Sequence, residues 1–263
     1  MYDLAVLNSA LAGTIFAGKL HFAPSTGSTN SDAMTAARAG APHGSVYFAD
    51  EQTAGRGRGN HTWHSTAGEG LYVSTIVRLP IPAVRLPLLP LAAGLAAAEA
   101  IRSVSGLAVD LRWPNDLLIG PRKTGGILAE AGSSPKGLPH AVVVGIGINV
   151  HQRRFDPDLA TPATSLDVES GCTINRQQLL IAVLQSLEGE TAALLDSTAC
   201  AAIPARLAAA STWIEGRHVL VHGPQACVGI TAGLDENGFL LVRTAEGLVQ
   251  VHTGGIRDAA DPR

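Results

Sequence analysis

The sequence predicts an α+β protein that has a mixed sheet with flanking helices, followed by a small all-β unit. In the first 210 residues, strand patterns are linked by hairpins in some places and by helices in others, whereas strict strand and helix alternation would predict a doubly wound sheet. After about Ser211 the pattern changes to short strands separated by turns such as Asp235-Glu236-Asn237-Gly238. We therefore predict two domains, residues 1–210 and 211–263.

The elements of the first domain follow from local signals. Ser28 or Thr29 can cap a helix that ends near Arg38, and a strand is expected at residues 46–49. A polar, glycine-rich stretch from 50 to 70 predicts a long ordered loop, which is usually functional. The remaining elements are an alternating strand at 71–79, a buried helix at 88–104, a strand at 109–113, a hairpin of 117–119 with 127–131, a buried strand at 141–150 and an amphipathic helix at 176–195.

The second domain is predicted to contain only strands. Each candidate is short and is bounded by residues that favour turns. The four strands are expected at residues 219–221, 228–232, 239–242 and 248–251.

Length, charge and cysteine content exclude several classes of protein. A chain of 263 residues with 46% hydrophobic residues is long enough to form a substantial core. The formal net charge of -3 disfavours a general affinity for nucleic acid or anionic membranes. Cys172, Cys200 and Cys227 match neither a disulfide framework nor a zinc spacing, so we expect three buried thiols in a reducing compartment.

Neither a membrane span nor a secretion signal is expected. The most apolar stretch, residues 86–101, contains two prolines and Glu99 and falls short of the roughly 20 apolar residues that cross a bilayer. The N-terminus carries Asp3 where a signal peptide needs positive charge. We expect a cytoplasmic protein.

The first motif with chemical content is Glu51-Gln52-Thr53-Ala54-Gly55-Arg56-Gly57-Arg58-Gly59. Its glycines allow backbone N–H groups to approach an anion, and its two arginines supply donors without an acceptor. Such a loop suits a carboxylate and a phosphate held together. A solvated loop, or an RNA-binding segment rich in glycine and arginine, is the alternative interpretation.

The second motif runs from Arg112-Trp113-Pro114-Asn115-Asp116 to Lys123. The proline ends a strand, and we expect Lys123 in the following turn, where its ammonium can follow charge that develops on phosphorus or a carbonyl oxygen. An ordinary basic hairpin turn is the alternative. The third motif is the apolar strand 143–150, in which Asn149 can pair with the N6 donor and N7 acceptor of adenine or can bond to backbone.

In their order and wording these motifs resemble those of the biotin protein ligase family. Further segments carry the same resemblance: Gly27-Ser28-Thr29-Asn30, Trp63, Leu71-Tyr72-Val73-Ser74, Gly126-Ile127-Leu128 and Ala163-Thr164-Ser165-Leu166. The resemblance implies a class II synthetase-like catalytic domain and a C-terminal SH3-like barrel. It also implies a two-step reaction, in which biotin and Mg-ATP give biotinyl-5'-adenylate and the adenylate then acylates one lysine of a biotin carboxyl carrier protein.

The resemblance also implies roles for individual residues. Biotin contacts are expected from Ser28, Thr29, Gln52, Gly55, Arg56, Arg58, Lys123 and Gly126, and adenylate contacts from Arg56, Arg58, Trp63, Lys123 and Asn149. Lys123 would act in both chemical steps, and Arg58 would close the loop over the adenylate. Asp116 would orient the acceptor lysine, act through Mg²⁺, or have a structural role in its turn. The sequence identifies no metal ligands.

Some features depart from the family or leave alternatives open. The loop has Gly59-Asn60-His61 where the family usually carries a further arginine, and the C-terminal residues 253–257 match only loosely, so no site residue is assigned there. A lipoate-type acyl-protein ligase and a non-catalytic RNA- or ligand-binding module are the alternative functions. The early position of Gly27 predicts no preceding DNA-binding domain and no DNA binding. The carrier is expected to be that of acetyl-CoA carboxylase or a similar carboxylase, and a homodimer is one option for the oligomeric state.

Two histidines and two tryptophans are interpreted without a catalytic role. His61 and His64 lack a third metal ligand nearby, so we expect surface or loop-packing roles. Trp113 and Trp213 are expected in the core.

Overall fold

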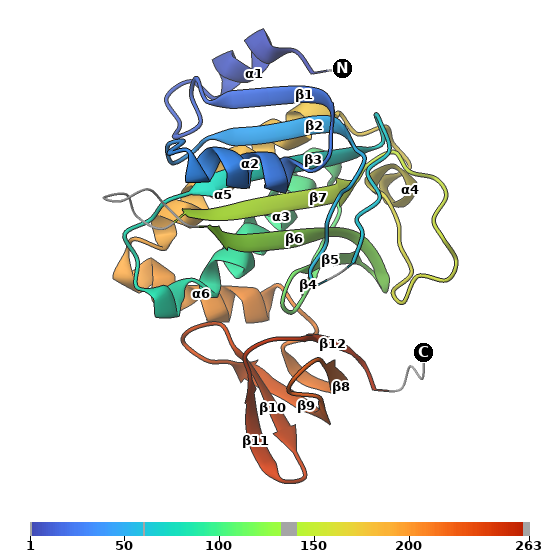
Figure 1. The fold of residues 1–263 in the computed structure, drawn as a ribbon. Helices are drawn as coiled ribbons and strands as arrows, with labels where there is room; N and C mark the ends of the chain where they lie inside the picture. Colours follow the sequence, from blue (N-terminus) through green and yellow to red (C-terminus); the bar gives the residue numbers. More distant parts are fainter. Residues whose placement is uncertain (1, 60, 133–140, 260–263) are drawn as a thin grey trace.

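A computed structural model describes residues 2–59, 61–132 and 141–259. Its larger unit is a seven-stranded sheet in the order β1-β2-β3-β7-β6-β5-β4 within these residues (Figure 1). The strands of this sheet are β1 (Leu20–Thr26), β2 (Val46–Gln52), β3 (Gly70–Val77), β4 (Asp110–Arg112), β5 (Asp116–Ile119), β6 (Arg122–Gly132) and β7 (Ala141–Asn149). β1 pairs parallel with β2 and the other pairs are antiparallel, which confirms the predicted mixed sheet.

Helices cover both faces of this sheet. The helices are α1 (Leu4–Ala10), α2 (Thr29–Arg38), α3 (Leu88–Ser105), α4 (Leu166–Ser170), α5 (Arg176–Ala193) and α6 (Ser197–Ala209), with a short 3₁₀ turn at Ala83–Arg85. α2 lies on one face, while α3 and α5 lie on the other (Figure 1). The predicted α+β class with flanking helices is therefore confirmed.

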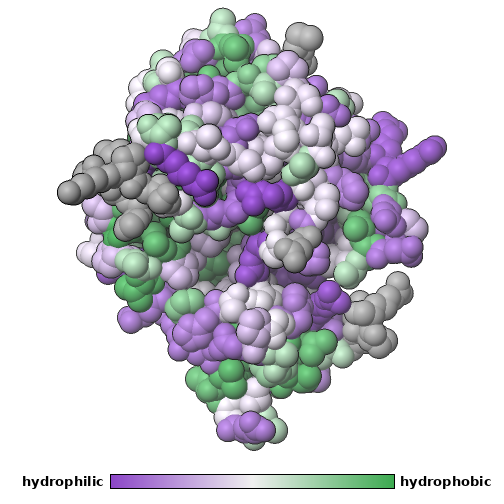
Figure 2. Space-filling view, in the orientation of Figure 1, coloured by the Kyte–Doolittle hydropathy of each residue, from purple (hydrophilic) through white to green (hydrophobic). Residues whose placement is uncertain are grey.

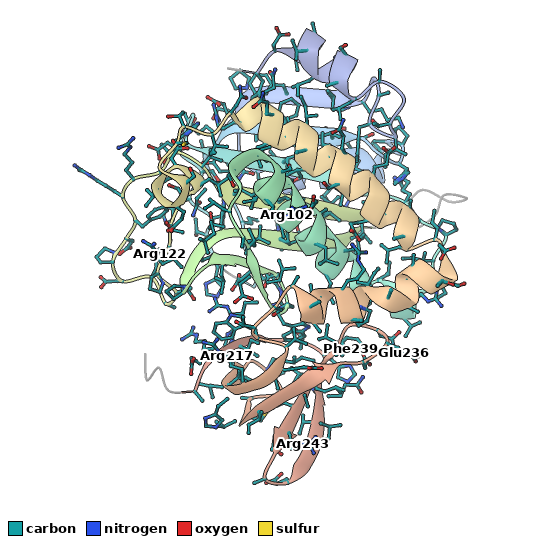
Figure 3. All side chains as sticks on the ribbon, turned by 180° about the vertical axis from the view of Figure 1, so that it is seen from behind. Arg102, Arg122, Arg217, Glu236, Phe239 and Arg243 are labelled. Atoms are coloured by element: carbon teal, nitrogen blue, oxygen red, sulfur yellow. The ribbon has the colours of Figure 1, made fainter. Side chains whose placement is uncertain are left out.

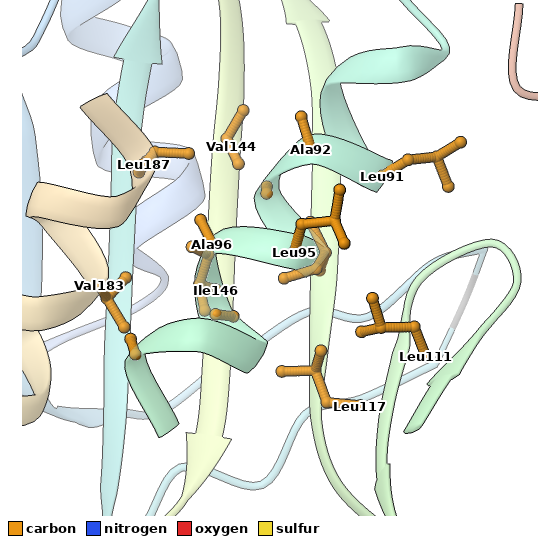
Figure 4. Packing of buried hydrophobic residues seen from close by; sticks show 14 of the residues in the cluster. Leu91, Ala92, Leu95, Ala96, Leu111, Leu117, Val144, Ile146, Val183 and Leu187 are labelled. Atoms are coloured by element: carbon orange, nitrogen blue, oxygen red, sulfur yellow. The ribbon is translucent and has the colours of Figure 1, made fainter. Parts of the chain in front are cut away.

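The main core lies between the sheet, α3 and α5. Figure 4 shows Leu91 and Leu95 of α3 near Leu111 and Leu117 of the sheet. A smaller cluster joins Ala33 and its neighbours in α2 to the opposite face of β3 and β7. β3 is buried along its whole length because helices cover it on both sides, so its alternating sequence does not mark a solvent face.

The stretch Ala83–Ser105, which comprises the 3₁₀ turn and α3, is apolar and long enough to cross a membrane by length and composition alone. In the structure 61% of its most apolar window is buried inside the protein. Packing in the core therefore accounts for its apolar character.

Up to residue 259, where the described part of the chain ends, the smaller unit is a five-stranded antiparallel sheet in the order β11-β10-β9-β8-β12, which confirms a C-terminal β domain. Its strands are β8 (Glu215–His222), β9 (Cys227–Leu234), β10 (Leu240–Thr244), β11 (Gly247–Val251) and β12 (Gly255–Asp258). The turn that carries Glu236 and Phe239 lies under the helical layer in the rear view (Figure 3). There the indole N–H of Trp113 donates to the Gly238 carbonyl oxygen at 3.1 Å, and a Cβ on Gly238 would meet Leu91 at 2.5 Å.

Several elements differ from the prediction. Lys123 lies in strand β6 and not in the hairpin turn, because Gly120 adopts φ +56 and allows a tight turn before Arg122. β2 continues to Gln52, so the loop begins later than predicted. The prediction of three buried cysteines is confirmed for Cys200 and is wrong for Cys172, which is exposed, and for Cys227, which is only half-buried.

Candidate active site

A cavity of about 760 Å³ lies where the loop after β2, the ends of β5–β7 and the C-terminal unit meet. Hydrophilic residues gather across the middle of this face, between the large sheet and the small one (Figure 2). The cavity is lined by nearly all the predicted site residues: Ser28, Thr29, Gln52, Arg56, Arg58, Trp63, Asp116, Lys123, Gly126 and Asn149. Only Gly55 of the predicted set is not among the lining residues.

The N-terminus of α2 and the end of β2 form the first wall. Ser28 occupies the N-cap position, but its side chain makes no capping hydrogen bond. Gln52 Oε1 accepts from the N–H of Thr29 at 2.9 Å and from its hydroxyl at 3.0 Å, and Gln52 Nε2 donates to Ser65 Oγ at 2.7 Å. The side chain of Gln52 thus connects the N-terminus of α2 to Ser65 at the end of the loop, and these hydrogen bonds fix the orientation of its amide.

Gly55 has a local packing role in the structure. A Cβ there would lie 2.4 Å from the carbonyl oxygen of Trp63 and 2.8 Å from Ser65 Oγ. The N–H of Trp63 donates to the Gly55 carbonyl oxygen at 2.9 Å. Glycine at this position therefore lets the two arms of the loop pack against each other. This packing explains why a larger residue would not fit, and no contact with a ligand is needed to explain it.

Arg56 is held by a carboxylate that the motifs did not include. Its guanidinium makes two parallel hydrogen bonds to Glu130, at 3.0 and 2.6 Å. Glu130 also accepts from Asn30 Nδ2 at 2.9 Å, and Asn30 Oδ1 accepts from Ser74 Oγ at 2.5 Å. Since Ser74 also bonds to Thr29 at 2.8 Å, the arginine is linked through side chains to the first wall.

Arg58 crosses to the C-terminal unit. Its Nη1 donates to the Gly254 carbonyl oxygen at 2.6 Å. Burial lowers the pKa of Arg58 from its usual value, and the nearby Asp116 opposes this. The loop therefore contacts a segment in which the sequence assigned no site residue.

Asp116 lies between two cations. Its Oδ1 is 2.5 Å from Lys123 Nζ, and its Oδ2 is 2.6 Å from Arg112 Nη2. Burial would raise the pKa of Asp116, but Lys123 and Arg112 hold it below its usual value. The carboxylate is thus ionised and positions both cations, and Arg112 in addition donates to Thr161 Oγ1 at 2.8 Å.

Trp63 lies across the sheet at Gly147, where an added Cβ would be 2.7 Å from the indole ring. Lys123 Nζ is 5.6 Å from the centre of that ring. The indole Nε1 is buried and has no hydrogen-bond partner among the described residues. A buried donor of this kind is satisfied when a ligand brings an acceptor.

The other two tryptophans are buried, as predicted. Trp113 lines the cavity but makes its hydrogen bond to Gly238. Trp213 lies between two guanidinium groups, with Arg217 at 3.8 Å and Arg112 at 5.2 Å from the ring centre.

Lys123, Gly126 and Asn149 share the floor of the cavity. The N–H of Lys123 donates to the Pro162 carbonyl oxygen at 2.8 Å, which anchors the segment 162–164 beside β6. Asn149 Nδ2 donates to the Thr164 carbonyl oxygen at 3.0 Å. The nearest atom to a Cβ on Gly126 would be Lys123 Cε at 3.5 Å, so this glycine leaves free space on the cavity side.

No group of three histidine, cysteine, aspartate or glutamate side chains that could hold a metal occurs in the described part of the chain. His61 and His64 are exposed on the loop. Asn60, which follows Gly59 in the sequence, lies outside the described residues.

Residues 22–149 match the biotin/lipoate A/B protein ligase family, and residues 216–256 match the biotin protein ligase C-terminal domain. The biotin--[acetyl-CoA-carboxylase] ligase of Mycobacterium tuberculosis is 34% identical over 239 residues, which are 88% of this chain and 85% of that protein. The chain belongs to the biotin protein ligase family.

Other relatives agree with this assignment. The bifunctional ligase/repressor BirA of Bacillus spizizenii is 35% identical over 235 residues, 87% of this chain and 70% of that protein. The biotin protein ligase from Aquifex aeolicus in complex with biotin and ATP superposes with a TM-score of 0.78 at 28% identity, covering 91% of this chain and 98% of that chain. The family resemblance expected from the motifs is thereby confirmed.

Proposed function

We propose that the protein activates biotin with ATP to biotinyl-5'-adenylate and transfers biotin to a lysine of a carboxylase carrier domain. The observation that carries this is the convergence of Arg56, Arg58 and Lys123 on one cavity next to Trp63 and Asn149. Relatives named as biotin ligases of acetyl-CoA carboxylase, and a relative solved with biotin and ATP, support it.

The first step joins two anions and needs fixed positive charge. The biotin carboxylate oxygen forms a bond to the α-phosphorus, and the bond to the β-phosphate oxygen breaks, which releases pyrophosphate. Lys123 carries the mobile ammonium of the site, and its link to Asp116 sets where that ammonium rests before ligands arrive. Arg56 and Arg58 add guanidinium donors from the loop.

In the second step the acceptor lysine nitrogen bonds to the biotinyl carbonyl carbon, AMP leaves, and the nitrogen loses a proton. Lys123 supports the charge that develops on the carbonyl oxygen and on the departing phosphate. The loop from 53 to 64, fastened at Gln52 and Ser65, shields the mixed anhydride from water.

The biotin reaction is favoured over the lipoate-type alternative. The match to the biotin protein ligase C-terminal domain and the names of the curated relatives are specific to biotin. A non-catalytic RNA-binding module is disfavoured by the same relatives, which are named as ligases.

The finer assignments extend the proposal. Mg²⁺ would enter as the complex with ATP, since the carboxylate beside Lys123, that of Asp116, is already bonded to Lys123 and Arg112. The smaller unit would be an SH3-like barrel and the larger one a class II synthetase-like domain, with the boundary at residues 210/211. The acceptor would be the biotin carboxyl carrier protein of acetyl-CoA carboxylase or a similar carboxylase, in the cytoplasm, with no DNA or membrane partner and with a homodimer as one assembly.

The test is biotin-dependent exchange of labelled pyrophosphate into ATP, with lipoate and octanoate as controls, followed by labelling of a carrier domain. Exchange with biotin alone supports the proposal. For Lys123→Ala we expect both exchange and transfer to fall by at least about a hundredfold, and for Arg58→Ala we expect weaker biotin binding and faster escape of the adenylate. Absence of exchange in folded protein with any of the three acids would contradict the proposal.

A further inference from the structure

One wall of the cavity carries three arginines and a histidine, which come from four parts of the chain. Arg58 belongs to the loop, Arg112 to β4, His222 to β8 and Arg257 to β12, and all four line the cavity. Asp116 on β5 is the carboxylate that acts on this group, and it is shared between Arg112 and Lys123. Even without Arg257, the cations Arg58, Arg112 and Lys123 share this one carboxylate, so the wall suits a ligand with several negative charges.

His222 is fixed in this wall by its neighbouring strand. It pairs with Gly255 across β8 and β12, and a Cβ on Gly255 would lie 2.7 Å from ring atoms Cε1 and Nε2. The imidazole therefore lies directly on the backbone of β12. The preceding carbonyl, that of Gly254, accepts the hydrogen bond from Arg58, so the same two glycines position the imidazole and the guanidinium.

The surroundings of His222 determine its charge in the ligand-free protein. Burial lowers its pKa, Arg257, Arg112 and Arg58 lower it further, and Asp116 raises it. The imidazole is therefore neutral at pH 7. A polyanion bound against the wall should raise the pKa of His222, because its negative charge stabilises the protonated ring and offsets the charge of the arginines.

We propose that His222 takes up a proton when the polyphosphate chain of ATP binds in this cavity. This inference rests on the proposed function, since it gives His222 a part in binding that substrate. A neutral histidine that becomes charged only with the ligand adds a fourth cation without repelling its neighbours in the empty site. ATP affinity should therefore rise as the pH falls.

Isothermal titration calorimetry with MgATP at pH 7, in buffers of different ionisation enthalpy, measures the protons taken up. The terminal phosphate of ATP also titrates near this pH, so the quantity of interest is the difference between the wild type and His222→Gln. We expect the wild type to take up a larger fraction of a proton, and its ATP affinity to fall with rising pH by up to tenfold per unit relative to the variant. His218→Gln, on the same strand and exposed, is the matched control and should behave as the wild type.

Two further arms locate the contact. Pyrophosphate should show the same difference between wild type and His222→Gln, while AMP and biotin should show none. Gly255→Ala keeps the imidazole but pushes the ring away, and should reduce the difference. Equal proton uptake by wild type and His222→Gln, with ATP binding and pyrophosphate exchange intact, would overturn the inference alone, and an equal effect with AMP would overturn the polyphosphate assignment. Absence of ATP binding in every protein would instead contradict the proposed function.

Discussion

Replacing Asp116 with asparagine should destabilise the protein and make it more responsive to ATP. The change keeps the shape of the side chain but removes the charge that lies 2.5 Å from Lys123 and 2.6 Å from Arg112. Loss of one partner from a buried ion pair destabilises a protein by about 3 to 5 kcal/mol. The side chain of Lys123 is 27% exposed, so we take the lower end, about 3 kcal/mol.

This free energy corresponds to a measurable shift in melting temperature. An unfolding entropy of about 2.1 cal/mol/K per residue gives roughly 0.55 kcal/mol/K for a chain of this size, hence a decrease of about 5 °C. Because Lys123 and Arg112 lose their counterion, phosphate ligands should replace it. MgATP should therefore raise the melting temperature of the variant by more than that of the wild type.

The pH dependence gives an independent check. The folded pKa of Asp116 lies below its usual value of 3.8, so the stabilisation is fully present above that value and is lost as the pH falls through the folded pKa. Thermal unfolding at several pH values should show a constant difference between the two proteins near neutral pH and a smaller one in acid. Glu99→Gln, in the exposed pair with Arg102, is the control and should change the melting temperature by about 1 °C or less. A melting temperature for Asp116→Asn equal to that of this control, with no added response to MgATP, would refute the reasoning.

Three other predictions concern two glycines of the cavity and one half-buried histidine. In Gly147→Ala the contact with Trp63 must lengthen from 2.7 Å to at least 3.4 Å, so we expect pyrophosphate exchange to slow by tenfold or more with little change in stability. Gly126→Ala meets no protein atom closer than 3.5 Å, so a rise in the KM for biotin would locate biotin there and an unchanged KM would exclude that contact. Burial holds the pKa of His43 below 6.5, so His43→Asn should weaken the loss of stability in urea unfolding as the pH falls below 6.5, and an unchanged loss would contradict this.

Much of the fold was predictable because its elements have strong local patterns. The helix at 88–105 and the strand at 141–149 are apolar enough to be recognised without a partner. β1 was missed because an edge strand with Pro24 has no clear alternation, and α6 was missed because Pro204 inside it is normally a sign that a helix ends. Lys123 was placed in a turn because no local signal shows that the turn before it has only two residues.

The candidate site was predictable to the extent that its residues form contiguous motifs. The partners of those residues were not, because they are distant in sequence. Glu130 is 74 residues from Arg56, and Gly254 is 196 residues from Arg58. Glu130 follows the lysine motif by a few positions on β6, so its place on the same strand was a usable signal. Residues 253–257 were assigned no site role because their match to the family is loose and their place at the cavity depends on how the two units pack together.

The shared wall of the cavity makes its ligands part of the contact between the two units. A molecule that fills the cavity touches the larger unit and the small sheet at once, with Arg58 already bonded to Gly254 between them. Because thermodynamic coupling is reciprocal, the free energy that the small unit adds to ligand binding equals the free energy that the ligand adds to the association of the small unit with the larger one. If the chain were divided between Ala209 and Glu215 and the two fragments were produced separately, the fragments should therefore bind each other more tightly in the presence of substrate than without it.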